Sequence, residues 1–317
     1  MSTQKYALGI DLGGTTIKFG LVNDSGKIKK KFSLDTYASD GPEAVIAQIK
    51  KGIAQLINSK QNVLGIGIGT PGLVIKKKGT VENPPNFPGW ESIPLGSLLK
   101  EECGKKVYVE NDANAAAIGE MIFGAGKKYD NFVMITLGTG VGGGIIINRK
   151  IYKGESGGAG EIGHISINEK GRLCKCGSRG CIETYAGNNY LIDQVKKELP
   201  RYKESKLHQL IGEGNTLTPK LIHKAYLLND SYAEMIITDL GQKIGAALAS
   251  LVNIVDIANI LIGGGVAGFG NILLDTIETT IKERVMKPIR PRIIVKPAKL
   301  KNEAGIKGAS ALVFYKS

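Results

Sequence analysis

The sequence has no hydrophobic run that we expect to act as a membrane span or a signal peptide. Its start, MSTQKYALGID, has too few consecutive apolar residues for a secretory leader. The most apolar region, Ile244–Gly265, is interrupted by Asn253, Asp256 and Asn259. We therefore interpret it as a buried helix followed by a buried strand. These absences lead us to expect a cytoplasmic protein without a membrane partner.

Residues that bind metals or form disulfides are scarce, and the few present are clustered. The 317-residue chain has four cysteines and three histidines. Three of the cysteines, Cys174, Cys176 and Cys181, fall within one short segment that follows His164. Cys103 lies apart, and we expect an inert thiol there. Any thiol chemistry of this chain is therefore concentrated in the segment that ends at Cys181.

Acidic residues are outnumbered, since 29 Asp and Glu stand against 42 Lys and Arg and give a formal net charge of +13. Such an excess of positive charge raises the question of nucleic-acid binding. However, the lysines occur in short runs, at 29–31, 76–78 and 127–128, and the sequence has no basic helix and no stripe of interleaved aromatic residues. We expect a solvated lysine surface and no nucleic-acid partner.

Glycine, by contrast, is abundant, with 43 residues gathered in short clusters. Two segments, 5–23 and 131–148, share one pattern of strand, glycine turn and strand. Their recurrence after about 125 residues suggests two related halves with a cleft between them. Apolar patterns predict further strands at 63–69, 106–110 and 257–262, and helices at 42–58 and from about 113. Strands that alternate with helices predict an α/β protein with largely buried sheets.

The first glycine turn has the composition of a phosphate-binding loop. It follows a predicted strand and has the sequence DLGGTT, from Asp11 to Thr16. Gly13 and Gly14 let backbone N–H groups approach a phosphate, and the two threonines, Thr15 included, add hydroxyl donors. The aspartate is suited to hold a magnesium ion or its water. The alternative is an ordinary β-hairpin turn, and this segment alone does not distinguish the two.

Two further glycine turns also follow predicted strands. The segment LGTG contains Gly138, Thr139 and Gly140 and is placed to clamp a phosphate chain from the second half. The segment IGGGVAG contains Gly263–Gly265 at the end of a buried strand, where α/β proteins place nucleotides. None of the three turns has the P-loop spacing or the dinucleotide fingerprint in its strand–helix context, so neither of those classes is predicted.

The segment VENDANAAAIGE, Val109–Glu120, places polar residues between a predicted strand and an alanine-rich helix. In one interpretation Asn111 or Asp112 caps the helix, which contributes about 0.5–2 kcal/mol to stability. In the other, Asp112 is a general base that takes a proton from a substrate hydroxyl. The two interpretations are compatible if the neighbouring residues divide the tasks.

The cysteine cluster supplies three sulfurs, from Cys174, Cys176 and Cys181, and His164 supplies one imidazole. This is a ligand set for tetrahedral Zn²⁺, and four protein ligands would make the metal structural. Two glycines inside CKCGSRGC allow the tight turns that bring the ligands together. Buried free thiols and a redox pair are the alternatives. We favour zinc, because stable disulfides are rare in a reducing cytoplasm.

Six motifs, in order along the chain, resemble those of the ROK (repressor, open reading frame, kinase) sugar kinases: DLGGTTIKFGLV, GTPG, ENDANAAAIGE, LGTGVGGG, GGAGEIGH and CKCGSRGCIE. The pattern is most similar to that of the bacterial ATP-dependent glucokinases. The resemblance implies an α/β fold of the actin-like ATPase (ribonuclease H-like) type, with two α/β domains flanking a cleft. It also implies that the last helix returns to the first domain. The expected domains are 1–120 plus 303–317, the smaller, and 121–302, the larger, which carries the zinc loop.

The resemblance also implies a role for each matching residue. The position of the family's catalytic base is matched by Asp112. The sugar-binding positions are matched by Asn86, Asn111, Asp112, Glu161, His164 and Glu183. The positions on the nucleotide side are matched by Asp11, Gly13, Gly14, Thr15, Thr16, Lys18, Gly138, Thr139, Gly140, Gly263, Gly264 and Gly265. The zinc ligands are matched by His164, Cys174, Cys176 and Cys181.

The activity implied is transfer of a phosphoryl group from ATP, accompanied by Mg²⁺, to the 6-hydroxyl of an aldohexose, D-glucose above all. Kinases of N-acetylglucosamine, mannose, fructose or allose, and polyphosphate as the donor, stay open as alternatives. A sugar-responsive repressor is an alternative of another class, but the first strand begins by about Tyr6 and we expect no DNA-reading helix before it. A zinc-binding nucleic-acid module would leave Asp112 and the glycine turns unexplained. Family members are commonly dimers or tetramers, so we expect a homodimer or homotetramer.

Overall fold

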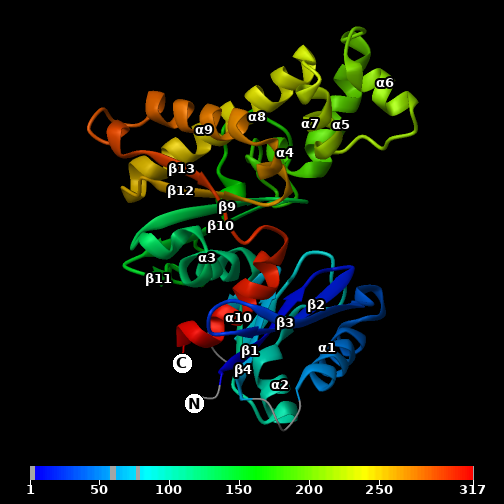
Figure 1. Ribbon diagram of the computed structural model, residues 1–317, viewed down its shortest axis with the longest axis vertical. Coiled ribbons are helices and arrows are strands. Elements are labelled where there is room, and N and C mark those ends of the chain that lie inside the picture. The colour runs from blue at the N-terminus through cyan, green and yellow to red at the C-terminus, as the bar shows by residue number, and fades with distance from the viewer. Residues whose placement is uncertain (1–3, 58–61, 76–78, 317) are drawn as a thin grey trace. The chain divides into compact units, whose positions relative to one another are not determined.

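A computed structural model describes residues 4–57, 62–75 and 79–316 (Figure 1). The lysine run at 76–78 lies outside the described residues, and so does Asn58, the predicted end of the first helix.

The chain divides into two compact units, and each combines strands and helices as the sequence predicts. Unit 1 comprises Met1–Asp130, Gly144–Gly160 and Lys299–Ser317, and unit 2 comprises Asn131–Gly143 and Glu161–Ala298. A domain is a part of the chain that can fold on its own, which is a different property from compactness. The expected domains, 1–120 plus 303–317 and 121–302, therefore stay a prediction.

Unit 1 is built on a five-stranded sheet with the order β3-β2-β1-β4-β8. Its strands are β1 (Tyr6–Leu12), β2 (Thr16–Asn23), β3 (Ile28–Asp35), β4 (Val63–Thr70) and β8 (Val107–Asn111). The first three strands are antiparallel neighbours, whereas β1, β4 and β8 run parallel to one another. The predicted strand–turn–strand at 5–23 is therefore confirmed, and so are the strands at 63–69 and 106–110 within a residue or two.

The sequence of β4 alternates isoleucine with glycine because its two faces are covered differently. Ile66 and Ile68 are fully buried in a core shared with α1 (Pro42–Leu56) and α2 (Leu95–Cys103). On the other face, a Cβ atom at Gly67 would overlap the carbonyl oxygen of Ala309 in α10 (Ala304–Lys316). Glycine therefore lets the last helix of the chain pack directly on the first strands, as α10 in red beside β1 in blue shows in Figure 1.

The other elements of unit 1 are short, apart from α3, which also packs on α10. They are η1 (Ala38–Asp40), β5 (Leu73–Ile75), β6 (Thr80–Glu82), β7 (Ser92–Ile93), α3 (Asp112–Phe123), η3 (Ala125–Lys128), β11 (Lys150–Ile151) and η8 (Lys301–Glu303). Strands β5, β6 and β7 form a small antiparallel sheet. The helix α3 begins at the end of β8, close to the predicted position.

Unit 2 contains three parallel strands, β9 (Phe132–Leu137), β12 (Asn259–Gly263) and β13 (Ile294–Pro297). They belong to a sheet of order β11-β10-β9-β12-β13, in which β10 (Val141–Ile147) starts in unit 2 and continues past Gly144 in unit 1. The predicted strand–turn–strand at 131–148 is confirmed. The strand predicted at 257–262 begins two residues late, because Asp256 takes a left-handed conformation (φ 51°) to end the preceding helix.

Helices make up most of unit 2. They are η4 (Ile162–His164), α4 (Glu183–Ala186), α5 (Asn188–Glu198), η5 (Leu199–Arg201), α6 (Lys206–Gly212), α7 (Pro219–Leu227), α8 (Ser231–Val255), η6 (Gly265–Phe269), α9 (Asn271–Arg284) and η7 (Arg290–Arg292).

The longest helix, α8, is a core helix. Among the residues described, it is the one helix long and apolar enough to cross a membrane by length and composition. Its side chains at Leu240, Ile244 and Leu248 are nevertheless buried inside unit 2. Gly241 and Gly245 bring it close to α9, because a Cβ atom at either position would lie under 3 Å from a threonine Cβ of α9. The predicted buried helix is confirmed.

Candidate functional site

The carboxyl ends of β1, β4 and β8 lie together at one edge of the unit 1 sheet, because these strands are parallel. The register places Asp11 opposite Gly69, and Gly69 opposite Glu110. Asn111 and Asp112 follow directly on β8. The first glycine turn and the predicted base therefore lie at the same edge, which is where α/β sheets bind their ligands.

The DLGGTT segment forms a tight turn between β1 and β2. The N–H of Gly13 donates to the carbonyl of Thr16 at 3.2 Å, and Thr36 Oγ1 donates to the carbonyl of Gly13 at 2.6 Å. Asp11 forms an ion pair with Lys18 at 3.2 Å, and its carboxylate lies against Gly305 at the start of α10. The segment is thus a hairpin turn, and its binding of phosphate stays a prediction.

Asn86 lies beside this turn. Its Cβ is 3.3 Å from the position that a Cβ atom on Gly14 would occupy. Asn86 adopts a left-handed backbone conformation (φ 69°), which asparagine tolerates better than most residues. The loop is anchored nearby by an edge-to-face contact of Phe87 with the buried Trp90. The proline-rich loop thereby brings the predicted sugar ligand next to the first glycine turn.

Of the two residues that the sequence left open as the helix cap, the structure selects Asn111. The Asn111 side chain is the N-cap of α3 and accepts from the N–H groups of Ala113 at 3.0 Å and Asn114 at 3.2 Å. Its amide nitrogen donates to the carbonyl of Gly72 at 3.3 Å. Asp112 is the exposed first residue of α3, and its carboxylate accepts from the N–H of Ala113 at 2.8 Å. Asn111 is therefore the helix cap, and Asp112 is held as the first residue of α3.

In unit 2, the second glycine turn lies next to Glu183. Within the turn, the N–H of Gly138 donates to the carbonyl of Gly140 at 3.0 Å. Glu183 Oε2 accepts from the N–H of Val141 at 3.0 Å and would lie 2.5 Å from a Cβ atom on Gly140. Glycine at position 140 therefore makes room for the carboxylate. The predicted sugar ligand and the predicted phosphate turn, with Thr139 at its centre, adjoin each other.

Glu161 and His164 lie on one turn that packs on the same strand start. The N–H of His164 donates to the carbonyl of Glu161 at 3.0 Å, and both side chains are exposed. Between them, a Cβ atom at Gly163 would overlap the carbonyl of Val141. Val141 therefore contacts both Glu183 and the turn that carries Glu161 and His164.

The glycines at the end of β12 have different structural reasons. Gly264 has φ 87°, and a Cβ atom there would overlap the backbone of Leu137. A Cβ atom on Gly263 would lie 2.9 Å from the end of the Met134 side chain, whereas Gly265 has no atom within 4 Å of that position. Gly264 is thus required by the fold, and Gly265 borders open space.

The four predicted zinc ligands converge. The Sγ of Cys174 lies 3.7 Å from Nδ1 of His164, and the Sγ of Cys176 lies 3.7 Å from that of Cys181. All four ligand atoms lie within 4.8 Å of one another. Tetrahedral zinc, with bonds of about 2.3 Å to sulfur and about 2.0 Å to nitrogen, separates its ligands by roughly 3.5–3.8 Å. The donor set and its spacing therefore fit Zn²⁺.

Local backbone geometry shapes this cluster. The N–H of Cys174 donates to the carbonyl of Ser178, and Gly177 and Gly180 adopt positive φ angles of 91° and 67°. Burial raises the pKa of the Cys181 thiol to about 12. A cation bound to the sulfur would favour the thiolate form instead.

A comparison of the sequence with known families decides the assignment. Residues 7–316 match the ROK family. The chain belongs to the ROK family. Its fold is accordingly the α/β fold of the actin-like ATPases that the sequence predicts.

The ROK chain is similar to enzymes and to repressors. It is 35% identical to a glucokinase of Thermotoga maritima over 306 residues, which cover 96% of each chain. A xylose repressor of Caldicellulosiruptor bescii is 32% identical and covers 96% of this chain, which spans 77% of the repressor. Among solved structures, a ROK family glucokinase from Streptomyces griseus in complex with glucose and AMPPNP has a TM-score of 0.83 at 37% identity, covering 97% of this chain and 98% of that one.

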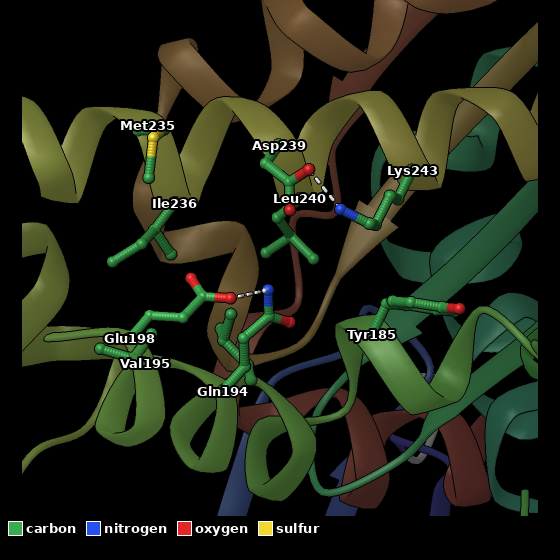
Figure 2. Close-up of a pocket in the computed structure, with 10 residues that line it drawn as sticks. Tyr185, Gln194, Val195, Glu198, Met235, Ile236, Asp239, Leu240 and Lys243 are labelled. Atoms are coloured by element: carbon green, nitrogen blue, oxygen red, sulfur yellow. Dashed lines mark hydrogen bonds and ion pairs between the residues drawn. The ribbon is translucent and has the colours of Figure 1, made fainter. Parts of the chain in front are cut away.

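The ROK chain also has a cavity apart from these residues. It measures about 230 Å³ and lies between α5 and α8 (Figure 2). Its apolar floor includes Leu191 and Leu240, and its polar groups already bind one another: Gln194 donates to Glu198 at 3.0 Å, and Lys243 pairs with Asp239. None of the predicted site residues lines it, and its satisfied polar groups indicate no ligand chemistry.

Two charged groups beside the site are absent from the sequence prediction. Glu110, two residues before the predicted base, forms a largely buried ion pair of 2.6 Å with Lys153. Glu110 stands inside the ENDANAAAIGE motif, which is the only sequence signal for it. Lys153 stands outside all the motifs, so nothing in the sequence points to it.

Proposed function

We propose that this ROK chain is an ATP-dependent hexokinase that phosphorylates the 6-hydroxyl of an aldohexose, D-glucose above all. The observation that carries the proposal is the full-length likeness to a glucokinase solved with glucose and AMPPNP. The exposed carboxylate of Asp112 at the carboxyl edge of the unit 1 sheet supports it. The proposal includes action in the cytoplasm as a homodimer or homotetramer, without a nucleic-acid or membrane partner.

Asp112 is the general base in the proposed reaction. In the proposal, the Asp112 carboxylate, at the start of the helix that Asn111 caps, orients the 6-hydroxyl and accepts its proton. Oxygen O6 attacks the γ-phosphorus in line, the bond from that phosphorus to the bridging oxygen breaks, and ADP leaves. Asn86, Asn111, Glu161, His164 and Glu183 hold the other sugar hydroxyls.

The glycine turns hold the nucleotide in this proposal. The turn at 11–16 and the turn at 138–140 bind the phosphates through backbone N–H groups and threonine hydroxyls, and Gly265 faces the adenosine. Lys18, which pairs with Asp11, offers a further cationic group. Asp11 would hold the Mg²⁺ that accompanies the nucleotide, and the ion would neutralise charge on the phosphate oxygens.

The zinc ligands have a structural task. Cys174, Cys176, Cys181 and Nδ1 of His164 would hold Zn²⁺ and so fix the loop that ends two residues before Glu183. The Nε2 atom of His164, on the other side of its ring, is left for a sugar hydroxyl. The metal takes no part in the transfer itself.

A coupled assay tests the function. The purified protein is given glucose, mannose, fructose, allose or N-acetylglucosamine, each with ATP or with polyphosphate, and the product is identified by the position of its phosphate. We expect the highest kcat/KM with glucose and ATP, and phosphate at the 6-position. Higher kcat/KM for another sugar would move the assignment within the sugar kinases. If none of the sugars is phosphorylated, the proposal that the protein is a sugar kinase is wrong.

The likeness to xylose repressors favours one alternative, a sugar-responsive DNA-binding protein. A gel-shift series across salt concentrations addresses it, because charge-driven binding by a chain of net charge +13 fades as salt rises whereas sequence-specific binding persists. We expect no band that survives about 0.2 M salt. Light scattering on the same sample gives the oligomeric state.

A further inference from the structure

A largely buried ion pair joins Lys153 to Glu110, which stands two residues before the predicted base. The ammonium of Lys153 is 2.6 Å from Oε2 of Glu110, and the two side chains are only 14% and 6% exposed. By contrast, the pair formed by Lys50 and Glu102 in the same unit is 39% and 53% exposed. Exposed pairs contribute little to stability, whereas a buried pair is costly to break because one charge stays behind without a partner.

The carboxylate of Glu110 binds residues on both sides of Asp112, the backbone of one and the side chain of the other. Its Oε1 atom accepts from the N–H of Asn111 at 3.1 Å and from the side-chain amide of Asn114 at 3.4 Å. Asn111 in turn caps α3. Both carboxylate oxygens are therefore occupied by donors, and those donors surround the start of the helix that carries Asp112.

The backbone of Lys153 closes a second segment of the site. Its carbonyl accepts from the N–H of Ala159 at 3.2 Å, which forms a loop of residues 153–159. The tip of this loop packs on β5, because a Cβ atom at Gly157 would lie 3.1 Å from the carbonyl of Val74. One residue, Gly160, separates the loop from Glu161, the first predicted sugar ligand of the GEIGH segment.

We propose that Lys153 is a positioning residue for phosphoryl transfer and that it acts through Glu110. Its ammonium group neutralises the buried carboxylate that holds Asn111 and the start of α3, and its carbonyl ties the loop before Glu161 to the same point. Without the ammonium, Glu110 is a buried carboxylate lacking a counter-charge, and the strand end must shift or admit water. A displacement of about 1 Å at a catalytic group costs roughly 100-fold in rate. This inference rests on the proposed function.

Four variants test it. Lys153→Met keeps the length of the side chain and removes its charge, and Lys153→Arg keeps the charge. The double variant Lys153→Met/Glu110→Gln removes both charges together. Lys50→Met is the matched control, because it removes the lysine of an exposed pair in the same unit. For each we measure kcat, the KM values for glucose and ATP, the melting temperature, and hydrogen exchange of residues 107–118 and 153–160 without substrates.

We expect Lys153→Met to lower kcat/KM for glucose about 10- to 100-fold and to leave the KM for ATP within about twofold. Lys153→Arg should recover most of the lost kcat/KM. The double variant should have a higher kcat/KM for glucose than Lys153→Met, since it leaves no lone charge buried. Exchange should accelerate in both segments of Lys153→Met and in neither segment of Lys50→Met. A lower melting temperature with unchanged glucose kinetics would reduce Lys153 to a merely structural role and overturn the proposal.

The two readouts separate this proposal from the function on which it rests. If the wild-type protein phosphorylates no hexose, the proposed function fails, while hydrogen exchange still measures the tie between the two segments. If hydrogen exchange of residues 107–118 and 153–160 is unchanged in Lys153→Met, Lys153 does not hold the two segments in place, whatever the activity is.

Discussion

Glu183 and Val141 are joined by a hydrogen bond of 3.0 Å from the backbone N–H to Oε2, although they stand 42 positions apart. Val141 directly follows the glycine turn at 138–140, and Glu183 follows the cysteine cluster. A predicted sugar ligand is therefore held by the strand that leaves the predicted phosphate turn. Substitutions of Glu183 should therefore affect the binding of both the sugar and the nucleotide.

Glu183→Gln and Glu183→Ala should differ in a defined way. Glutamine keeps an oxygen that can accept from Val141, so we expect the KM for glucose to rise about tenfold with little change in the KM for ATP. Alanine leaves that N–H without its partner, so the KM for ATP should rise as well. Steady-state kinetics with each substrate varied in turn measure both effects. Equal KM values for ATP in the two variants would contradict the shared role.

Asp112→Asn should lose at least about 10³-fold in kcat, because an amide cannot accept the proton of the 6-hydroxyl. Its melting temperature should stay near that of the wild type, since Asn111 is the N-cap of α3. The matched variant is Asn111→Ala, which should cost about 1 kcal/mol of stability. Calorimetry and a coupled assay on both variants separate base from cap. A collapse in the melting temperature of Asp112→Asn would argue for a structural aspartate.

Cys176→Ser should lower the zinc content and weaken glucose binding together. Cys176 is the exposed member of the cluster, so serine should fit without disturbing the core. Zinc is measured by metal analysis of the purified protein, and glucose binding by calorimetric titration. Cys103→Ser serves as the control, because that half-buried thiol in unit 1 lies outside the cluster. A variant that lacks zinc but keeps its glucose affinity would show that the loop is rigid on its own.

Gly264→Ala and Gly265→Ala should have different effects on stability and on the KM for ATP, although the two residues are neighbours. Alanine at 264 must adopt φ 87° and overlap Leu137, so we expect a loss of about 2 kcal/mol or more in stability. Alanine at 265 meets no atom within 4 Å, so the protein should fold normally. If Gly265 faces the adenosine, the KM of Gly265→Ala for ATP should rise severalfold while its KM for glucose stays unchanged. An unchanged KM for ATP would remove Gly265 from the nucleotide site.

Asp230 should make the stability of the protein sensitive to acid. Burial alone would raise the pKa of its carboxyl, but hydrogen bonds from Ser205, Tyr232 and Ala233 outweigh burial and hold the pKa below its usual range. A lowered native pKa stabilises the protein above the unfolded pKa of about 3.9, and that contribution is lost as the pH falls through the native value. The melting temperature of the wild type should exceed that of Asp230→Asn by a constant margin from about pH 5 to 7 and by less below about pH 4. A margin that widens in acid would reverse the sign.

The sequence predicts the parts of this site whose patterns are local. The glycine turns, the alanine-rich helix and the cysteine cluster each depend on residues close together in the chain, and each is found where it was expected. The choice between Asn111 and Asp112 as the cap was not predictable, because both residue types cap helices well. The structure decides it, because the Asn111 side chain accepts from the N–H groups of both Ala113 and Asn114.

The contacts that escape the sequence join distant segments. Glu110 and Lys153 are 43 positions apart, and nothing in the local pattern of either marks a partner. The same holds for Gly67 and Ala309, whose close approach follows from the packing of α10 on β4. The glycines of β4 signal a close approach, and only the structure says of what.

The packing of α10 on the first sheet bears on how this protein is made. A ribosome adding about 5–20 residues per second releases β1 and β4 long before the last helix, and the interval is on the order of 10–50 s. During that time the glycine face of β1 and β4 has no α10 to cover it, and the nascent chain carries an unfinished sheet. Synthesis of unit 1 therefore begins before that of unit 2 and is completed after it.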